Sequence, residues 1–308
     1  MVKKIAFLFP GQGAQVIGMG KDFYTQYSTA REAFQHGDDI LNRSLTKIIF
    51  EGPAETLIET RNSQTGIYLT SIAILKVLQE QFPDLKPSVC AGLSLGEYSA
   101  LTAGEYLSFE SCLPLVQFRS EAMNEACEAM PGTMAALFGL PADEVEIMVR
   151  DLNLPHDLWV ANFNCPGQTV ISGTLKGVEA GMVAAKERGA KRVIPLKVHG
   201  AFHSGLMSVA EKKLADKISE IEISKGSSQL VMNVCGNFVT SLELIRSNLI
   251  KQVTSAVRWE QGIRAMMPTV ELYIEIGCGK TLASMNKQIG VSVPTITINT
   301  IEDLEKLL

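Results

Sequence analysis

The stretch that decides the fold is Val89-Cys90-Ala91-Gly92-Leu93-Ser94-Leu95-Gly96. A short apolar run ends at Gly92, and a helix-compatible segment from Glu97 to Ala103 follows. Glycines on both sides of Ser94 permit a tight strand-to-helix turn that exposes the serine hydroxyl as a nucleophile. Serine is also a good helix N-cap, and both roles are compatible because a helix N-terminus favours negative charge. The stretch predicts a buried strand, a sharp turn and a helix.

Apolar runs elsewhere extend this alternation of strands and helices. Residues Ile5–Phe9 form an apolar run that ends at a glycine-rich loop, Pro10–Gln15. Helical apolar spacing appears around Ile67–Leu78, and Leu272–Ile276 has the composition of a late core strand. We therefore expect an α/β protein with an α/β-hydrolase-like main domain.

The pattern changes between residues 129 and 198, where strands and helices alternate in a different order. Pro141 is expected as the first residue of a helix that ends near Leu152. The full set of expected elements is a strand Thr133–Leu140, that helix, strands Leu158–Phe163 and Gln168–Ser172, a helix Gly177–Arg188 and a strand Arg192–Val198. The order β-α-β-β-α-β predicts a ferredoxin-like insertion at 129–198 within a main domain formed by 1–128 and 199–308.

Composition excludes several classes of function. The chain has 308 residues, 46% of them hydrophobic, and a formal net charge of −5, which makes nucleic acid an unlikely partner. Six cysteines lie far apart without a C-x-x-C motif, as in proteins of a reducing compartment. No apolar run approaches the roughly 18 to 20 residues of a bilayer span. We expect a cytoplasmic protein that does not contact membranes, and a monomer because no large apolar stripe is left unassigned.

A serine nucleophile needs a base, and the chain offers four histidines. His36 and His156 lie in polar stretches and are expected to be exposed. His199 and His203 follow a predicted strand, where the sites of α/β proteins gather. A metal pair at these two positions is disfavoured because no glutamate lies between them and Gly200 opposes a regular helix. The expectation is a base and no metal.

Arg119 is the second unusual residue. Phe109, Cys112, Val116, Arg119 and Met123 recur at helical spacing and share one apolar face. A buried cation costs several kcal/mol unless an anion pairs with it. Arg119 therefore either binds a carboxylate of the protein or a ligand, or extends its guanidinium to the rim of the helix face.

Taken together, the motifs resemble the malonyl-CoA:acyl carrier protein transacylases of fatty-acid synthesis and the acyltransferase domains of polyketide synthases. The resemblance covers nearly the whole chain. It rests on the segments Phe9–Gln15, Gly92–Tyr98, Gln117–Ser120, Ala161–Gln168, Gly200–Ser204, Gln252 ahead of Val257-Arg258-Trp259, and Glu275–Lys280.

This resemblance implies an acyltransferase that moves malonyl from coenzyme A to the phosphopantetheine thiol of acyl carrier protein in a ping-pong reaction. Ser94 is then the nucleophile and His203 its general base, oriented by a carbonyl at Gln252. The backbone N–H groups of Gln12 and Leu95 form the oxyanion hole. Arg119 binds the malonyl carboxylate in a bidentate pair and thereby disfavours acetyl.

The resemblance also implies that Phe202 and Asn162 bind substrate, with the bulk of Phe202 beside the base excluding branched acyl groups. No metal or redox cofactor is implied. The partner is an acidic carrier protein that binds transiently, and Lys186, Arg188, Lys191 and Arg192 form a basic cluster that is a candidate contact.

Two departures from the family pattern and two other functions complete the expectations. Leu93 stands where many relatives have histidine, and Cys278 where proline is common. We expect the first to retune the pocket and the second to affect a turn.

A serine hydrolase of acyl thioesters would use the same Ser94 and His203, whereas a silent carrier-binding subunit would need neither.

Overall fold

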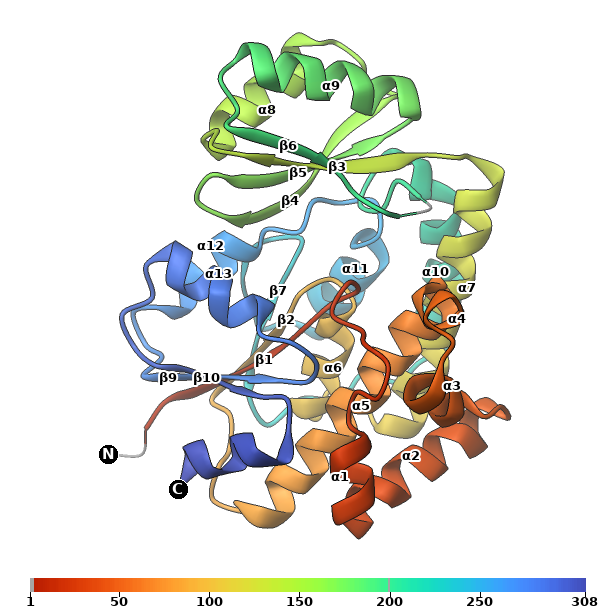
Figure 1. The fold of residues 1–308 in the computed structure, drawn as a ribbon, viewed down its shortest axis with the longest axis vertical. Helices are drawn as coiled ribbons and strands as arrows, with labels where there is room; N and C mark the ends of the chain where they lie inside the picture. The colour runs from red at the N-terminus through yellow and green to blue at the C-terminus, as the bar shows by residue number, and fades with distance from the viewer. Residues whose placement is uncertain (1–2, 199) are drawn as a thin grey trace.

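Two sheets organise the structure, a computed structural model that describes residues 3–198 and 200–308 (Figure 1). The larger sheet has six strands in the order β10 (Thr295–Ile298), β9 (Leu272–Ile276), β1 (Ile5–Phe9), β2 (Val89–Gly92), β7 (Gln229–Met232) and β8 (Asn237–Val239). Its strands are parallel except for β8, which pairs antiparallel with β7. The protein is mixed α/β, as the sequence predicts.

Strands β1 and β2 are apolar throughout, as expected for strands covered on both faces of the sheet. In β1, Phe7 and Phe9 point into the larger core, whereas Ala6 and Leu8 point into a second core on the opposite face. The α-helices of the chain are α1 (Lys21–Gln26), α2 (Ser28–Leu41), α3 (Leu45–Glu51), α4 (Ala54–Ile58), α5 (Thr60–Gln81), α6 (Gly96–Ala103), α7 (Phe109–Ala129), α8 (Ala142–Asp151), α9 (Leu175–Glu187), α10 (Ser208–Ser219), α11 (Leu242–Lys251), α12 (Trp259–Met266) and α13 (Thr281–Ile289). Short 3-10 helices span Gly205–Met207 and Ile301–Leu307.

A smaller antiparallel sheet forms a separate layer at the top of Figure 1. Its strand order is β4 (Leu158–Cys165), β5 (Gln168–Gly173), β3 (Thr133–Phe138) and β6 (Arg192–Pro195). Helices α8 and α9 cover one face, where Ala135 and Leu137 lie in a third core. Met134 and Ala136, on the other face of β3, belong to the larger core. The two layers therefore meet through the inner face of the smaller sheet.

Several boundaries differ from the sequence expectations for identifiable reasons. Strand β3 ends at Phe138 because Gly139 turns the chain with φ of +90°. The expectation that Pro141 is the first helical residue is wrong, since its ψ of 150° is extended and α8 begins at Ala142. Helix α9 begins earlier than Gly177, at Leu175, because the Thr174 side chain caps it. Strand β6 ends at Pro195 rather than Val198.

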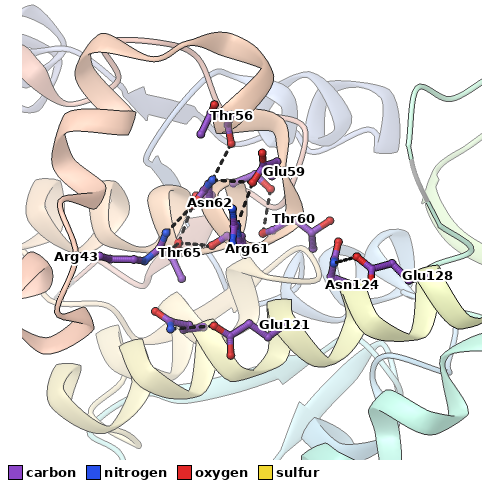
Figure 2. Close-up of polar contacts among 12 residues, drawn as sticks. Arg43, Thr56, Glu59, Thr60, Arg61, Asn62, Thr65, Glu121, Asn124 and Glu128 are labelled. Carbon is purple, nitrogen blue, oxygen red and sulfur yellow. Dashed lines mark hydrogen bonds and ion pairs between the residues drawn. The ribbon is translucent and has the colours of Figure 1, made fainter.

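Helix α5 carries a residue that the active site uses, and its first turns are anchored by polar contacts (Figure 2). Asn62 is 1% exposed, and its side chain accepts from Arg43 at 2.5 Å and donates to the Thr56 carbonyl at 2.8 Å. Arg43 also donates to Thr65 Oγ1 at 2.9 Å. Buried polar groups satisfied in this way fix a backbone closely, so the position of Gln64 on the same turn is well defined.

The turn between β2 and α6 is possible only with glycine at both ends. A Cβ on Gly92 would lie 2.0 Å from the carbonyl carbon of Gly96, and a Cβ on Gly96 would lie 2.1 Å from the Phe9 oxygen. The loop after β1 is held beside this turn, because Leu93 N donates to Phe9 O at 3.0 Å. The carboxyl ends of β1 and β2 thus present their loops side by side.

Gly92→Ala should therefore destabilise the protein by about 3 kcal/mol or more, because backbone atoms cannot move aside as side chains do. Urea unfolding measures this loss. Gly189→Ala is the control: its φ is +90° but a Cβ there meets nothing within 4 Å, so it should cost about 1 kcal/mol. Equal losses in the two variants would contradict the steric argument.

Candidate active site

Ser94 occupies the strained turn that the sequence predicts. Its φ is +52°, a left-handed value that is uncommon for a residue with a side chain. Ser94 N donates to Asn233 Oδ1 at 2.7 Å, which holds the turn from the end of β7. The serine hydroxyl is left free to point away from the turn, and it lines a cavity of about 450 Å³.

His203 lies against that hydroxyl. Ser94 Oγ donates to His203 Nε2 at 2.8 Å, and His203 Nδ1 donates to the carbonyls of Gln252 at 2.9 Å and Ser255 at 3.2 Å. Two carbonyl acceptors require a proton on Nδ1, so Nε2 carries the lone pair that accepts the serine proton. Burial, with a smaller effect of the charge on Arg119, lowers the pKa of His203 to about 4. The imidazole is neutral at pH 7 and suited to act as a base.

Arg119 is completely buried on α7, next to the same serine. It donates to Gln64 Oε1 at 2.5 Å, Gln252 Oε1 at 2.9 Å and Ser94 Oγ at 3.2 Å. In the described part of the chain these partners are all neutral, and Arg119 Nε has no partner. Burial lowers the pKa of Arg119. Gln64 and Ser94, which both accept from the guanidinium, line the cavity, whereas Arg119 itself lies behind them and is not among the lining residues.

The remaining predicted site residues surround the same cavity. Gln12, Asn162 and Phe202 all line it, and Leu93 lies on its wall as well. Leu95 is buried at the start of α6. Within residues 3–198 and 200–308, the N–H groups of Gln12 and Leu95 donate to no protein acceptor.

The other histidines do not join this cluster. His36 is exposed and faces Glu110, and His156 is exposed. His199 lies outside the described residues. No group of three or more His, Cys, Asp or Glu is arranged to hold a metal ion within the described ranges. All six cysteines are free. None of the helices in those ranges is both long and apolar enough to cross a membrane.

Three buried residues of the cluster were missed by sequence reasoning: Gln64, Glu97 and Asn233. Glu97 and Asn233 are 0% and 3% exposed, and Gln64 is 1% exposed. Burial raises the pKa of Glu97 to about 7, whereas two N–H donors and the charge of Arg119 lower it. One available signal was the charge of Glu97 among apolar neighbours, and another was the position of Asn233 directly after a core strand.

The sequence pattern that defines acyl transferase domains matches residues 6–298. The chain belongs to the acyl transferase family. This confirms the family expected from the motifs, and with it an acyltransferase activity. Because the match covers both sheets, the cluster around Ser94 lies within the family's own fold.

Individual members of the family are similar over their full lengths. A malonyl CoA-acyl carrier protein transacylase of Bacillus subtilis is 43% identical over 306 residues, 99% of this chain and 96% of that protein. One of Haemophilus influenzae is 36% identical over 97% of this chain and 96% of its own length. The crystal structure of the Clostridium perfringens transacylase superimposes with a TM-score of 0.94 at 34% identity, covering 99% and 96% of the two chains.

A second solved structure contains a protein partner. A malonyl-transacylase in complex with its type II PKS acyl-carrier protein has a TM-score of 0.95 and 33% identity, with 99% of each chain covered. The fold of this acyl transferase is thus shared with a relative that was captured with a carrier protein.

The depressed pKa of His203 predicts a pH-dependent stability. Between pH 6.5 and about 4 the unfolded chain binds a proton that the folded chain does not, so stability is lost as the pH falls through this window. His203→Asn, which tolerates a positive φ, should reduce the drop in unfolding free energy across the window by about 3 kcal/mol. Urea titrations from pH 4 to 7 measure it. Identical pH profiles for the two proteins would show that His203 is not buried as a neutral imidazole.

Proposed function

We propose that this acyl transferase moves a malonyl group from malonyl-CoA to the phosphopantetheine thiol of acyl carrier protein, and so supplies the extender unit of fatty-acid synthesis. One observation carries the proposal: a buried guanidinium with only neutral partners lies 3.2 Å from the hydroxyl of Ser94. A malonyl thioester has a free carboxylate at about this distance from its reactive carbonyl. The names of the relatives support the same substrate and acceptor.

In the proposed first half-reaction, Ser94 Oγ attacks the thioester carbonyl while His203 Nε2 takes its proton. The N–H groups of Gln12 and Leu95 stabilise the negative oxygen, each contributing about 10² to 10³ in rate. The carbon–sulfur bond then breaks, and His203 returns the proton to the leaving coenzyme A thiolate. A malonyl ester on Ser94 is the product.

The second half-reaction reverses these steps with another thiol. His203 takes the proton of the phosphopantetheine thiol, its sulfur attacks the ester, and Ser94 recovers the proton as the carbon–oxygen bond breaks. The Gln252 carbonyl, 2.9 Å from His203 Nδ1, keeps the imidazole oriented through both steps. The chemistry is acyl substitution, for which this chain's own groups suffice, and we propose no metal or redox cofactor.

Specificity for malonyl follows from Arg119 in this proposal. A carboxylate that pairs with the guanidinium gives it a charged hydrogen-bond partner, whereas acetyl leaves it with neutral partners only. Phe202, which is 7% exposed beside His203, and Asn162 both line the cavity, and we propose that they limit its width. Leu93, which also lines the cavity, is apolar where many relatives have a polar residue.

We also propose the finer description of the fold. Residues 1–128 and 199–308 form an α/β-hydrolase-like domain, and residues 129–198 form a ferredoxin-like insertion. The strand order β4-β5-β3-β6 with α8 and α9 on one face supports the second part. The tight turn at Ser94 after β2 supports the first. We infer a cytoplasmic monomer, since the cysteines are free and large exposed apolar side chains are scattered.

Intact-mass measurements test the central proposal. Wild-type protein incubated with malonyl-CoA should gain one malonyl group, and Ser94→Ala should gain none. Arg119→Ala should lose the preference for malonyl over acetyl, a preference of roughly 10² or more in rate. Rapid release of free malonate without carrier protein would instead identify a thioester hydrolase, and transfer that survives Ser94→Ala would show that the serine mechanism is wrong.

The acidic carrier protein is proposed to contact basic residues near the cavity mouth. Lys197 lines the cavity, Arg192 is exposed as the first residue of β6, and Lys191 is exposed directly before it. Arg188 contributes less, because it pairs with Asp151 at 2.7 Å. Lys186 is exposed near the end of α9.

Reversing the charges of Lys191 and Arg192 to glutamate should raise the KM for the carrier about fivefold and weaken its salt dependence, with the KM for malonyl-CoA unchanged. Lys4→Glu/Lys86→Glu is the matched control, since both residues are exposed before the amino-terminal ends of the central strands β1 and β2, whereas the Ser94 turn follows the carboxyl end of β2. Steady-state kinetics at several salt concentrations would reject this surface if the two double variants behave alike.

A further inference from the structure

Glu97 is a completely buried carboxylate at the start of α6, and the proposed mechanism leaves it without a role. Each of its oxygens accepts one N–H. Asn233 N donates to one oxygen at 2.6 Å, and Gln252 Nε2 donates to the other at 2.8 Å. Because both partners are donors, a side chain that accepts at both oxygens is required at this position.

The contact with Asn233 fixes the turn of the nucleophile. Asn233 Nδ2 donates to Gly92 O at 2.7 Å, and its Oδ1 accepts from Ser94 N at 2.7 Å. Glu97 thus fixes the backbone of Asn233, and the Asn233 side chain in turn binds the backbone on both sides of the strained turn, at Gly92 and Ser94.

The contact between Glu97 and Gln252 fixes the orientation of the Gln252 side-chain amide. Gln252 Nε2 donates to Glu97 and to Ser94 O at 2.9 Å, which leaves Oε1 as the acceptor for Arg119 at 2.9 Å. Rotating this amide by half a turn would place its NH₂ group against the guanidinium and its oxygen against the carboxylate. Both new contacts are repulsive, so the carboxylate of Glu97 determines which end of Gln252 faces Arg119.

We propose that Glu97 is a positioning residue that sets malonyl specificity by orienting the Gln252 side chain, and through it the guanidinium of Arg119. The inference rests on the proposed function, because it assigns to Arg119 the substrate carboxylate. Glu97 does not touch the substrate; it is absent from the cavity wall among the described residues. Its charge also provides a nearby anion for the buried Arg119.

Glu97→Gln tests the inference, because it keeps the shape of the side chain but replaces one acceptor by a donor. We expect the ratio of malonyl to acetyl transfer onto Ser94, measured as adduct formation by intact mass, to fall at least about tenfold. A purely structural role would slow both acyl groups equally and leave the ratio unchanged. That second result would overturn the inference.

Glu275→Gln is the matched control. Glu275 is a second buried carboxylate, and its oxygens accept from the backbone N–H groups of Leu282 at 3.0 Å and Ala283 at 2.9 Å. It lies away from Arg119 in the network, so its loss should leave the malonyl-to-acetyl ratio unchanged. A ratio that falls equally in both variants would show that any buried carboxylate has this effect and would overturn the inference.

Gln252→Ala keeps the backbone carbonyl that orients His203 and removes only the amide. The inference requires that this variant also lower the ratio, and that adding Glu97→Gln to it lowers the ratio no further. The first of these requirements, a lower ratio in Gln252→Ala, is testable even if Glu97→Gln does not fold. An unchanged ratio in Gln252→Ala, or independent effects in the double variant, would overturn it.

Wild-type protein measured alongside separates the two proposals. A wild type without any malonyl preference would overturn the proposed function and the inference with it. A wild-type preference that Glu97→Gln retains would overturn the inference alone.

Discussion

The burial of the Arg119 guanidinium is the constraint around which the active site is arranged. A cation at 0% exposure must be surrounded by acceptors, and the chain supplies oxygens from three separate elements: Gln64 on α5, Ser94 after β2 and Gln252 after α11. None of these oxygens carries a full charge. The hydrogen-bond partners of the cation are therefore all neutral, and in the proposed function the malonyl carboxylate supplies the missing anion.

Hydrogen bonds also connect the Glu97 carboxylate, the base His203 and the nucleophile Ser94 into one network. Gln252 contacts Arg119 and Glu97 through its side chain and His203 through its backbone carbonyl. The backbone N–H of Ser94 donates to Asn233, and its hydroxyl donates to His203. A network in which each member has several partners is rigid, so the geometry exists before substrate arrives and little reorganisation is needed.

Much of this arrangement was predictable from local sequence. Strands β1 and β9 have the predicted bounds because their apolar runs end sharply at glycine or proline. Helical spacing placed Arg119 on the apolar face of α7 but left open whether its guanidinium extends to the rim, and the structure shows it completely buried. Gln64, Glu97 and Asn233 were not predicted, because their contacts join positions 52 to 155 residues apart. The start of α8 was misplaced because the fixed φ of proline, −58° here, fits both an N-cap and a first helical position, and only the ψ of 150° distinguishes them.

The two sheets are joined by main-chain contacts as well as by side chains. Strand β4 of the smaller sheet forms a parallel bridge at Asn162 to Val257, just before α12, where Phe163 N donates to Val257 O at 2.9 Å and Val257 N donates to Ala161 O at 2.8 Å. Widening the cleft by swinging the smaller sheet outward would break both bonds next to a residue of the cavity wall. The width of the entrance is therefore a property of the backbone. The proposed acyl donor and acceptor, coenzyme A and acyl carrier protein, both carry a long, thin thiol arm. Each arm can enter a cleft of fixed width in turn, while the bulky remainder of the molecule stays outside.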